Sequence, residues 1–215
     1  MGRVAGGLKD KKALFITLEG VEGSGKSSLL NFLKKILKKK GFSLKLFRDP
    51  GSTQVGEKIR QILLDKKSKI SPHTELLLYL AARTQLIEEK LKKALRDYDI
   101  VICDRFYDST VVYQGYGLGL KIAQSLALKF CWGIKPDLTI VLDTDIKKGL
   151  SRIKNKDRIE KRPLDFHQRL KKGYYKLAKK EPGRIKLIKK ESLEEIFKEA
   201  EEIVEKFLKR WKRKF

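Results

Sequence analysis

The segment that most constrains this chain is a glycine-rich stretch near its start. Residues 20–27 read Gly-Val-Glu-Gly-Ser-Gly-Lys-Ser, which fits the pattern G-x-x-x-x-G-K-[ST] of phosphate-binding loops. An apolar run at residues 14–18 precedes it, and a helical pattern begins near Ser28. A strand, a glycine turn and a helix N-terminus in this order direct free backbone N–H groups at an anion. Lys26 is then expected to neutralise the outer phosphates of a nucleotide, and the Ser27 hydroxyl to hold Mg²⁺.

The length and composition fit one domain with its own core, since the chain has 215 residues, of which 41% are hydrophobic. We expect a single domain over residues 13–215 and a flexible arm over residues 1–12. No apolar stretch approaches the roughly 20 residues of a membrane span, and no apolar signal-peptide core follows the N-terminus. Cys103 and Cys131 lack metal-ligand spacing and are interpreted as reduced core residues of a cytoplasmic protein.

The net charge of +24 has two interpretations, a nucleic-acid-binding surface or a heat-adapted surface rich in Lys and Glu. The chain holds one Met and only two Asn, Asn31 and Asn155, and its basic residues are spread over nearly every helical pattern. These observations favour the surface of a thermophile, with no nucleic acid and no membrane as partner. The electric field of this positive charge would also steer anionic substrates to the protein.

Short apolar runs alternate with helical patterns along the whole chain, which predicts a parallel sheet covered by helices on both faces. Strands are expected at residues 14–19, 44–47, 100–103, 138–142 and 184–188. Helices are expected at residues 28–40, 53–64, 71–95, 145–154, 164–179 and 192–211, and in a region that runs to about residue 132 with an interruption at 115–119.

Ligands of such α/β sheets bind beyond the carboxyl ends of the strands. Three segments with charged or phosphate-binding residues lie at these ends of the strands. They are the glycine loop after the first strand, residues 48–53 after the second, and Asp104-Arg105 after the third. Their convergence predicts one active site. A GTPase switch is disfavoured because no glycine follows Asp104 at the required spacing, and Asn155-Lys156-Asp157 is one residue too short for a guanine-reading motif.

At this point the chain resembles the bacterial thymidylate kinases. Residues 15–27 look like the start of that family, and residues 48–53, 104–115, 135–139 and 157–160 match its further motifs in the same order. The resemblance implies a P-loop NTPase fold with a five-stranded parallel sheet, a nucleoside monophosphate kinase domain and a homodimer. It implies that ATP phosphorylates dTMP to dTDP with Mg²⁺ as the cofactor.

The resemblance also implies roles for the donor side of the site. Asp104 would hold Mg²⁺ or its waters together with Ser27, and Arg105 would bridge the phosphates of donor and acceptor. The lid, at about residues 152–163, is shorter than in the family; Arg158 is the first choice for its catalytic cation, with Arg152 or Lys156 as alternatives. The expected catalytic residues are Lys26, Asp104, Arg105 and Arg158. The expected ATP-binding residues are Gly20, Val21, Glu22, Gly23, Ser24, Gly25, Lys26, Ser27, Ser28 and Arg152, the last of which could stack on adenine.

On the acceptor side, Tyr79 and Arg83 are four residues apart and share one helix face, where a ring can stack on a base and a guanidinium can bond its edge. The resemblance implies that Arg60 grips the monophosphate and that Glu22, inside the phosphate loop, binds the 3′-hydroxyl. It places Tyr113 on the deoxyribose. The expected dTMP-binding residues are Glu22, Arg48, Pro50, Arg60, Tyr79, Arg83, Arg105, Ser109, Thr110, Tyr113 and Gln114.

Two other functions stay open at this point: another deoxynucleoside or nucleoside monophosphate kinase, and a basic nucleic-acid-binding ATPase. For the first choice we expect weak discrimination against dUMP, since one methyl group is worth about 1–3 kcal/mol, and strong discrimination against dCMP. His73 and His167 are isolated in the sequence and are interpreted as ordinary surface or core residues.

Overall fold

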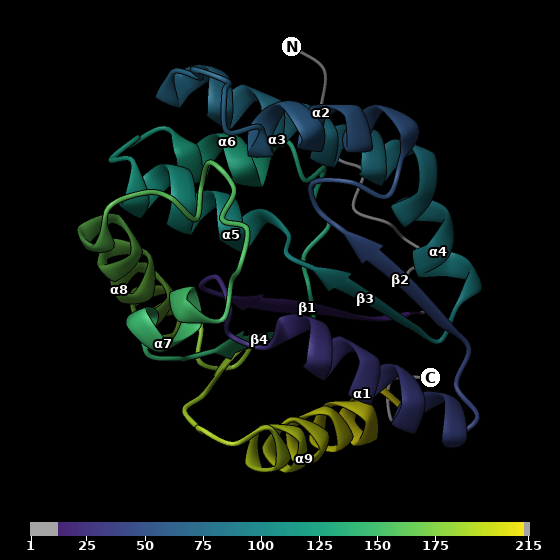
Figure 1. The fold of residues 1–215 in the computed structure, drawn as a ribbon. Coiled ribbons are helices and arrows are strands. Elements are labelled where there is room, and N and C mark those ends of the chain that lie inside the picture. Colours follow the sequence, from purple (N-terminus) through teal and green to yellow (C-terminus); the bar gives the residue numbers. More distant parts are fainter. Residues whose placement is uncertain (1–12, 213–215) are drawn as a thin grey trace.

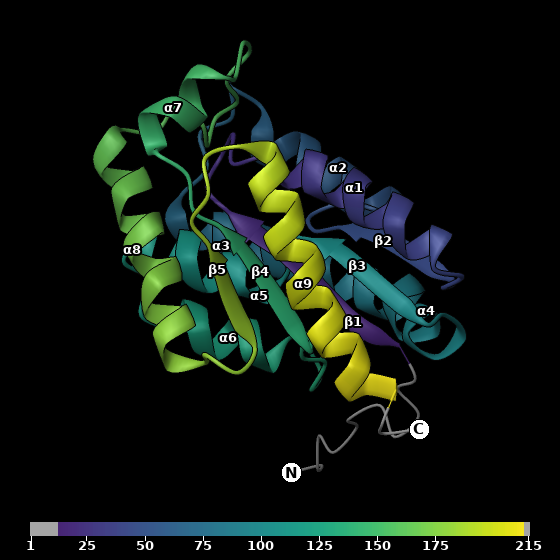
Figure 2. The ribbon, with the colours of Figure 1, turned by 90° about the horizontal axis from the view of Figure 1, so that it is seen from below.

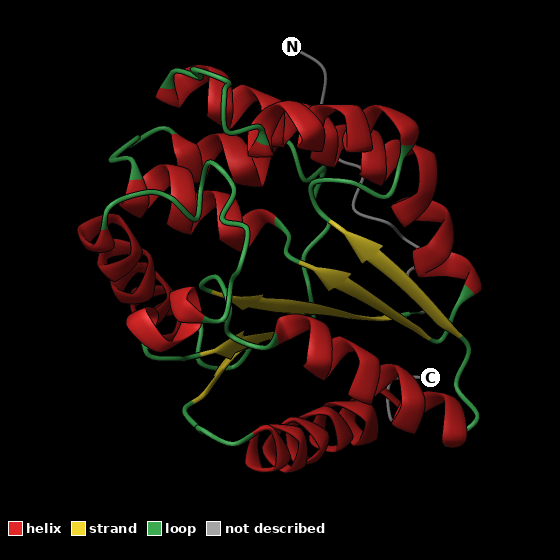
Figure 3. Ribbon diagram, viewed as in Figure 1, coloured by secondary structure: helices red, strands yellow, loops and turns green. Residues whose placement is uncertain are grey.

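The computed structural model describes residues 13–212, which form a five-stranded parallel sheet between two layers of helices (Figures 1 and 3). The strand order is β2-β3-β1-β4-β5. The strands are β1 (Leu14–Gly20), β2 (Leu44–Arg48), β3 (Ile100–Asp104), β4 (Leu138–Leu142) and β5 (Ile185–Ile188). The P-loop fold predicted from the sequence is confirmed, and each predicted strand is present within one residue of its expected bounds.

Two layers of helices bury the two faces of the sheet. The α-helices are α1 (Lys26–Lys39), α2 (Gln54–Leu64), α3 (Pro72–Leu86), α4 (Lys92–Asp97), α5 (Tyr107–Thr110), α6 (Ala123–Lys129), α7 (Ile146–Ser151), α8 (Leu164–Lys180) and α9 (Leu193–Lys212). Helices α1 and α9 cover one face of the sheet, as Figure 2 shows from below. They pack there through leucines such as Leu33 and Leu208. The opposite face packs on α4, α5 and α8 around Phe15.

The register of the strands aligns their carboxyl ends. Leu18 of β1 lies opposite Asp104 of β3, and Asp104 lies opposite Arg48 of β2. Gly20 lies opposite Leu142 of β4. The loops that follow these strands therefore leave from one edge, which is the arrangement that the sequence predicts for a common site.

Two helical predictions need correction. The helix expected over residues 71–95 is α3 and α4 joined by a π-helical segment, Ile87–Leu91. The interruption expected at 115–119 lies at residues 118–122, because a second π-helical segment, Val111–Gly117, continues through the first two glycines. Gly117 stays helical because it packs directly against Phe166 of α8, whereas Gly119 has φ +75° and leaves the helix.

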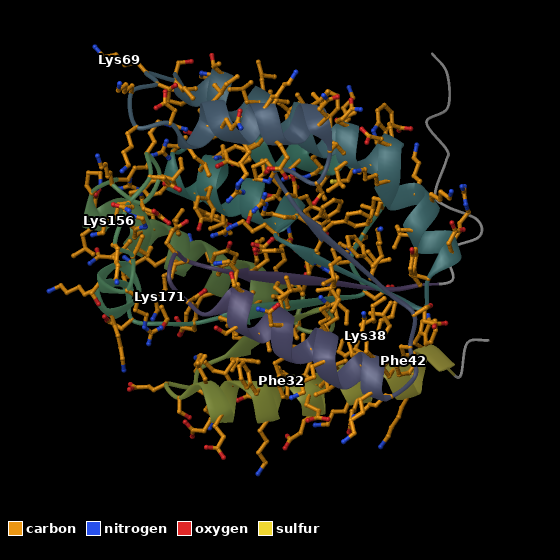
Figure 4. The ribbon with its side chains drawn as sticks, turned by 45° about the vertical axis from the view of Figure 1, so that its right-hand side comes forward. Phe32, Lys38, Phe42, Lys69, Lys156 and Lys171 are labelled. Carbon is orange, nitrogen blue, oxygen red and sulfur yellow. The ribbon has the colours of Figure 1, made fainter. Side chains whose placement is uncertain are left out.

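The described surface carries basic side chains on many elements, and Figure 4 shows Lys38 on α1, Lys69 before α3, Lys156 in the lid segment and Lys171 on α8. Between residues 13 and 212, no helix is both long and apolar enough to cross a membrane. The arm expected over residues 1–12 lies outside the described residues.

Candidate active site

The glycine loop has the backbone that its sequence predicts. The φ angles are positive at Gly20, Gly23 and Gly25, with values of +139°, +67° and +93°. Residues that carry a Cβ rarely adopt such angles. A Cβ on Gly23 would lie 2.0 Å from the carbonyl oxygen of Gly149, so the loop also needs glycine to pack on α7. No side chain of the described chain caps the start of α1, and its first turn holds no acidic residue. Its free N–H groups are thus available to an anion.

Lys26 lies across this loop. Its Nζ donates to the carbonyl oxygens of Gly20 and Val21, at 3.2 and 3.0 Å. Burial and the neighbouring Arg105 lower the pKa of Lys26 to about 8, against the opposing influence of Asp104 and Glu22. A phosphate in the loop would replace these carbonyls as the partner of the ammonium group.

A second cavity adjoins the loop at the same edge of the sheet. The expected acceptor residues line it, except for Arg48 and Thr110. Its lining residues are Glu22, Asp49, Pro50, Arg60, Leu64, Tyr79, Arg83, Arg105, Ser109, Tyr113, Gln114, Asp157, Ile159 and Glu160. We call it the acceptor cavity.

Arg105 connects the acceptor cavity to the glycine loop. Its Nη1 donates to the carbonyl oxygen of Gly20 at 3.0 Å and to Ser109 Oγ at 3.2 Å, and its Nη2 donates to Glu22 Oε1 at 3.3 Å. The guanidinium lies over the ring of Tyr113, 4.9 Å from its centroid. Its backbone φ of +69° is rare for a residue with a side chain.

Glu22 faces the acceptor cavity, away from the phosphate side of its own loop. Tyr113 donates to its Oε1, and Oε2 lies 3.4 Å from His167 Nδ1. Burial raises the pKa of Glu22, but His167, Arg105 and Lys26 together lower it to about 2. Sequence reasoning missed His167, which α8 brings beside Glu22 from 145 positions away; nothing in its local sequence marks it.

Glu19 is a second residue that sequence reasoning missed. It is fully buried at the end of β1, where burial raises its pKa. Its carboxyl group accepts bonds from Ser109 Oγ, at 2.5 Å, from Tyr174 Oη, at 2.7 Å, and from the N–H of Phe106. These bonds fix the turn that carries Arg105. An acidic residue at the end of an apolar run, next to a glycine loop, is the signal that could have found it.

The far end of the acceptor cavity holds Tyr79 and Arg83 from α3. Arg83 is buried and donates to Asp49 Oδ2 at 2.6 Å and to Thr110 Oγ1 at 2.8 Å. Its Nη1 has no hydrogen-bond partner within residues 13–212. Thr110 therefore lies behind Arg83 and supports it, which corrects the expectation that Thr110 lines the cavity.

Two further arginines lie elsewhere than expected. Arg48 is exposed and paired with Glu57 at 2.9 Å, outside the acceptor cavity. Arg158 is held by the carbonyl oxygen of Leu63 and by the buried carboxylate of Glu75, because a buried carboxylate needs a cationic partner. It points at α2 and α3 instead of the glycine loop. Arg152 does reach the loop, where its Nη1 donates to the carbonyl oxygen of Gly23 at 3.0 Å.

The residues expected to hold Mg²⁺ fit that ion. Asp104 Oδ1 is buried at the end of β3 and has no hydrogen-bond partner in the described part of the chain. Ser27 is exposed at the start of α1, beside Lys26. One carboxylate and one hydroxyl suit Mg²⁺, which keeps several of its waters. Among residues 13–212 there is no group of three or more His, Cys, Asp or Glu side chains that could hold a metal without such waters.

A glycine loop at an uncapped helix N-terminus, joined by an arginine to a second cavity with more arginines, defines a P-loop nucleotide kinase. Comparison with known proteins gives the family. The model of the family described as thymidylate kinase matches residues 18–200. The chain belongs to the thymidylate kinase family.

Individual relatives agree with this assignment. The thymidylate kinase of Thermoanaerobacter sp. (strain X514) is 42% identical over 202 residues, which cover 92% of this chain and 100% of the relative. The thymidylate kinase of Bacillus licheniformis is 40% identical over 205 residues, which cover 91% of this chain and 97% of the relative. The crystal structure of thymidylate kinase from Ehrlichia chaffeensis has a TM-score of 0.73 at 30% identity and covers 89% of this chain and 98% of that one.

Proposed function

We propose that this chain phosphorylates dTMP to dTDP with ATP as the donor. The observation that carries the proposal is the position of Arg105, which bonds both the carbonyl oxygen of Gly20 in the donor loop and Glu22 in the acceptor cavity. A guanidinium there can contact the phosphates of both nucleotides at once.

The contacts in the acceptor cavity support an assignment of its residues to the parts of dTMP. Arg60, whose Nη1 donates to the carbonyl oxygen of Pro50 at 3.1 Å, binds the 5′-phosphate. Tyr79 stacks on the base, and Arg83 offers its unpartnered Nη1 to the base edge. Glu22 accepts a hydrogen bond from the 3′-hydroxyl.

In the reaction, an oxygen of the dTMP phosphate attacks the γ-phosphorus of ATP, and the bond from that phosphorus to the bridging oxygen of ADP breaks. Little covalent chemistry is left to the protein, so Lys26 and Arg105 act by holding the phosphates in line and neutralising their charge. Ser27 and Asp104 would hold Mg²⁺, partly through water, and this ion supplies further neutralisation of the phosphates when bound. Residues 152–163 act as the lid, with Arg152 at the donor loop.

The test is a coupled ADP-release assay over dTMP, dUMP, dCMP, thymidine and AMP. We expect the highest kcat/KM with dTMP, a smaller reduction with dUMP than with dCMP, and little turnover of thymidine or AMP. Best turnover on thymidine, or none on dTMP, would overturn the proposal. ATP hydrolysis that DNA or RNA stimulates without any phosphorylated nucleotide product would favour the nucleic-acid-binding alternative.

A second copy of this chain is the partner that we propose. Helices α2, α3 and α6 lie together along one side of the molecule (Figure 1). Exposed apolar side chains lie on or beside these helices: Val55, Ile62, Leu77, Ile122 and Leu128. A two-fold dimer buries the same surface patch of both copies, and an exposed apolar patch suits such an interface. By light scattering we expect the mass of a dimer for the wild type and of a monomer for Leu77→Glu. The control is Leu193→Glu, because Leu193 is also an exposed leucine but lies on α9. This control variant should stay a dimer.

We also propose a heat-adapted protein of the cytoplasm. Heat adaptation is supported by ion pairs that join segments far apart in the chain. Two of them are Lys40–Glu201 at 2.9 Å and Lys148–Glu191 at 3.0 Å. The free thiols of Cys103 and Cys131 suit a reducing compartment, where ATP is also available. A thermal unfolding midpoint within the range of mesophile domains, about 45–65 °C, would contradict heat adaptation.

A further inference from the structure

Glu75 of α3 is a buried carboxylate behind the acceptor cavity that the reaction above does not use. Its side chain is fully buried and does not line the cavity. Oε2 accepts hydrogen bonds from Arg158 at 2.7 Å and Arg162 at 2.5 Å, both in the lid segment. Oε1 accepts a hydrogen bond from Gln114 Nε2 at 2.9 Å. One carboxylate thus serves two guanidinium groups and one side-chain amide.

This arrangement fixes the orientation of the Gln114 amide. Glu75 is ion-paired with the guanidinium groups of Arg158 and Arg162, and a carboxylate has only hydrogen-bond acceptors. An amide can satisfy such a partner only with its NH₂ group. The NH₂ of Gln114 is therefore held toward Glu75, and the amide oxygen is left for the acceptor cavity, which Gln114 lines.

Arg83 adds a hydrogen-bond donor to the acceptor that Gln114 presents. Its buried Nη1 has no partner among the described residues. A cavity wall with one donor and one acceptor matches a pyrimidine that carries an oxygen at position 4 and an N–H at position 3, as thymine does. Cytosine has the reverse pattern, an amino group at position 4 and a bare nitrogen at position 3.

We propose that Glu75 is a specificity-determining positioning residue: by holding the NH₂ of Gln114, it makes the cavity accept a thymine-type edge and reject a cytosine-type edge. The inference rests on the proposed function and adds a residue that does not itself touch the substrate. A site built for one hydrogen-bond pattern discriminates strongly, because the wrong base leaves buried polar groups unpaired.

The substitution Glu75→Gln tests this directly. Arg158 and Arg162 still require an acceptor, so the oxygen of the introduced amide faces them and its NH₂ faces Gln114. The Gln114 amide must then turn over, so that its oxygen accepts a hydrogen bond from that NH₂ group. Its own NH₂ group then faces the cavity as a donor. We expect kcat/KM to fall for dTMP and to rise for dCMP, so that their ratio narrows by at least about tenfold, roughly the effect of one exchanged hydrogen bond.

Glu89→Gln is the matched control, because Glu89 also accepts from a glutamine, Gln85, at 3.0 Å, but on the exposed side of the continuing helix. It should leave the dTMP to dCMP ratio unchanged. A ratio in Glu75→Gln equal to that of the wild type, in a variant that is folded by circular dichroism, would overturn the inference while the proposed function stands. Absence of dTMP turnover in the wild type would instead overturn the proposed function.

A measurement on the unaltered chain covers the case in which Glu75→Gln does not fold. In a crystal structure with bound dTMP, the bond between Gln114 Nε2 and Glu75 Oε1 should persist while the other end of the amide faces ring position 3. A Gln114 side chain that leaves Glu75 to reach the base would overturn the inference.

Discussion

Arg105 is the residue on which most of the proposed chemistry depends. Its guanidinium is held by Gly20, Ser109 and Glu22, and the Glu19 network fixes its turn. We expect Arg105→Ala to lower kcat by about 10³-fold or more, since an arginine on a transferring phosphoryl group has that order of effect. Steady-state kinetics with dTMP and circular dichroism check the expectation.

The control for this prediction is Arg48→Ala. Arg48 was expected at the acceptor but is exposed and paired with Glu57, outside the cavity. We expect kcat and KM for dTMP to change little in this variant. Near-normal turnover of Arg105→Ala, or a loss in Arg48→Ala as large as in Arg105→Ala, would show that the phosphates are held elsewhere.

The lowered pKa of Lys26 should make the proton uptake on ATP binding depend on pH. Its pKa is lowered to about 8 in the unliganded site, mainly by burial and Arg105. Bound phosphates favour the ammonium form and raise this pKa. ATP binding should therefore take up protons at about pH 9, where unliganded Lys26 is mostly neutral, and few at about pH 7, where it is already charged.

Calorimetry in two buffers of different ionisation enthalpy measures this uptake. Lys26→Arg is the control, because a guanidinium stays charged at both pH values and should show no uptake from this position. Equal uptake at about pH 9 in this variant and in the wild type would assign the proton to another group.

The contact between the π-helical segment Val111–Gly117 and α8 positions His167 beside Glu22. A Cβ on Gly117 would lie 2.6 Å from the ring of Phe166 and 2.8 Å from Leu170. Phe166 is buried and packs against Tyr113, so it has no room to withdraw. We expect Gly117→Ala to lower the free energy of unfolding by about 1–3 kcal/mol.

Denaturant unfolding measures this change, and Gly183→Ala is its control, because a Cβ there meets no atom within 4 Å. The control should differ from the wild type by less than about 0.5 kcal/mol. A Gly117→Ala variant as stable as the control would mean that α8 can move away from the π-helical segment at no cost.

The net charge of +24 attracts every nucleotide that approaches the protein. We expect the association rate constant of a fluorescent ATP analogue, measured by stopped flow, to fall steeply with added salt. The reason is that the screening length shrinks from about 10 Å at 0.1 M to about 3 Å at 1 M ionic strength. The dissociation rate constant should change much less. An association rate constant independent of salt would leave the charge without a role in substrate capture.

Most residues of the acceptor cavity were predicted through the resemblance to the thymidylate kinases. The sheet, the glycine loop and the helix face that Tyr79 and Arg83 share could be predicted from the chain alone. These follow from local patterns: apolar runs set the strands, positive-φ glycines set the loop, and the i, i+4 spacing of Tyr79 and Arg83 puts both on one helix face. Such patterns depend on residues close in the chain, so they survive without knowledge of what packs where.

The contacts between segments that lie far apart in the chain could not be predicted from local patterns. The fold brings Glu22 beside His167, and it brings Glu75 beside Gln114, Arg158 and Arg162. It also places Arg48 and Thr110 outside the lining of the acceptor cavity. A buried polar or charged side chain pairs with whichever group the folded backbone brings within its reach. That partner is set by the packing of α3, α8 and the lid segment, which no local spacing encodes.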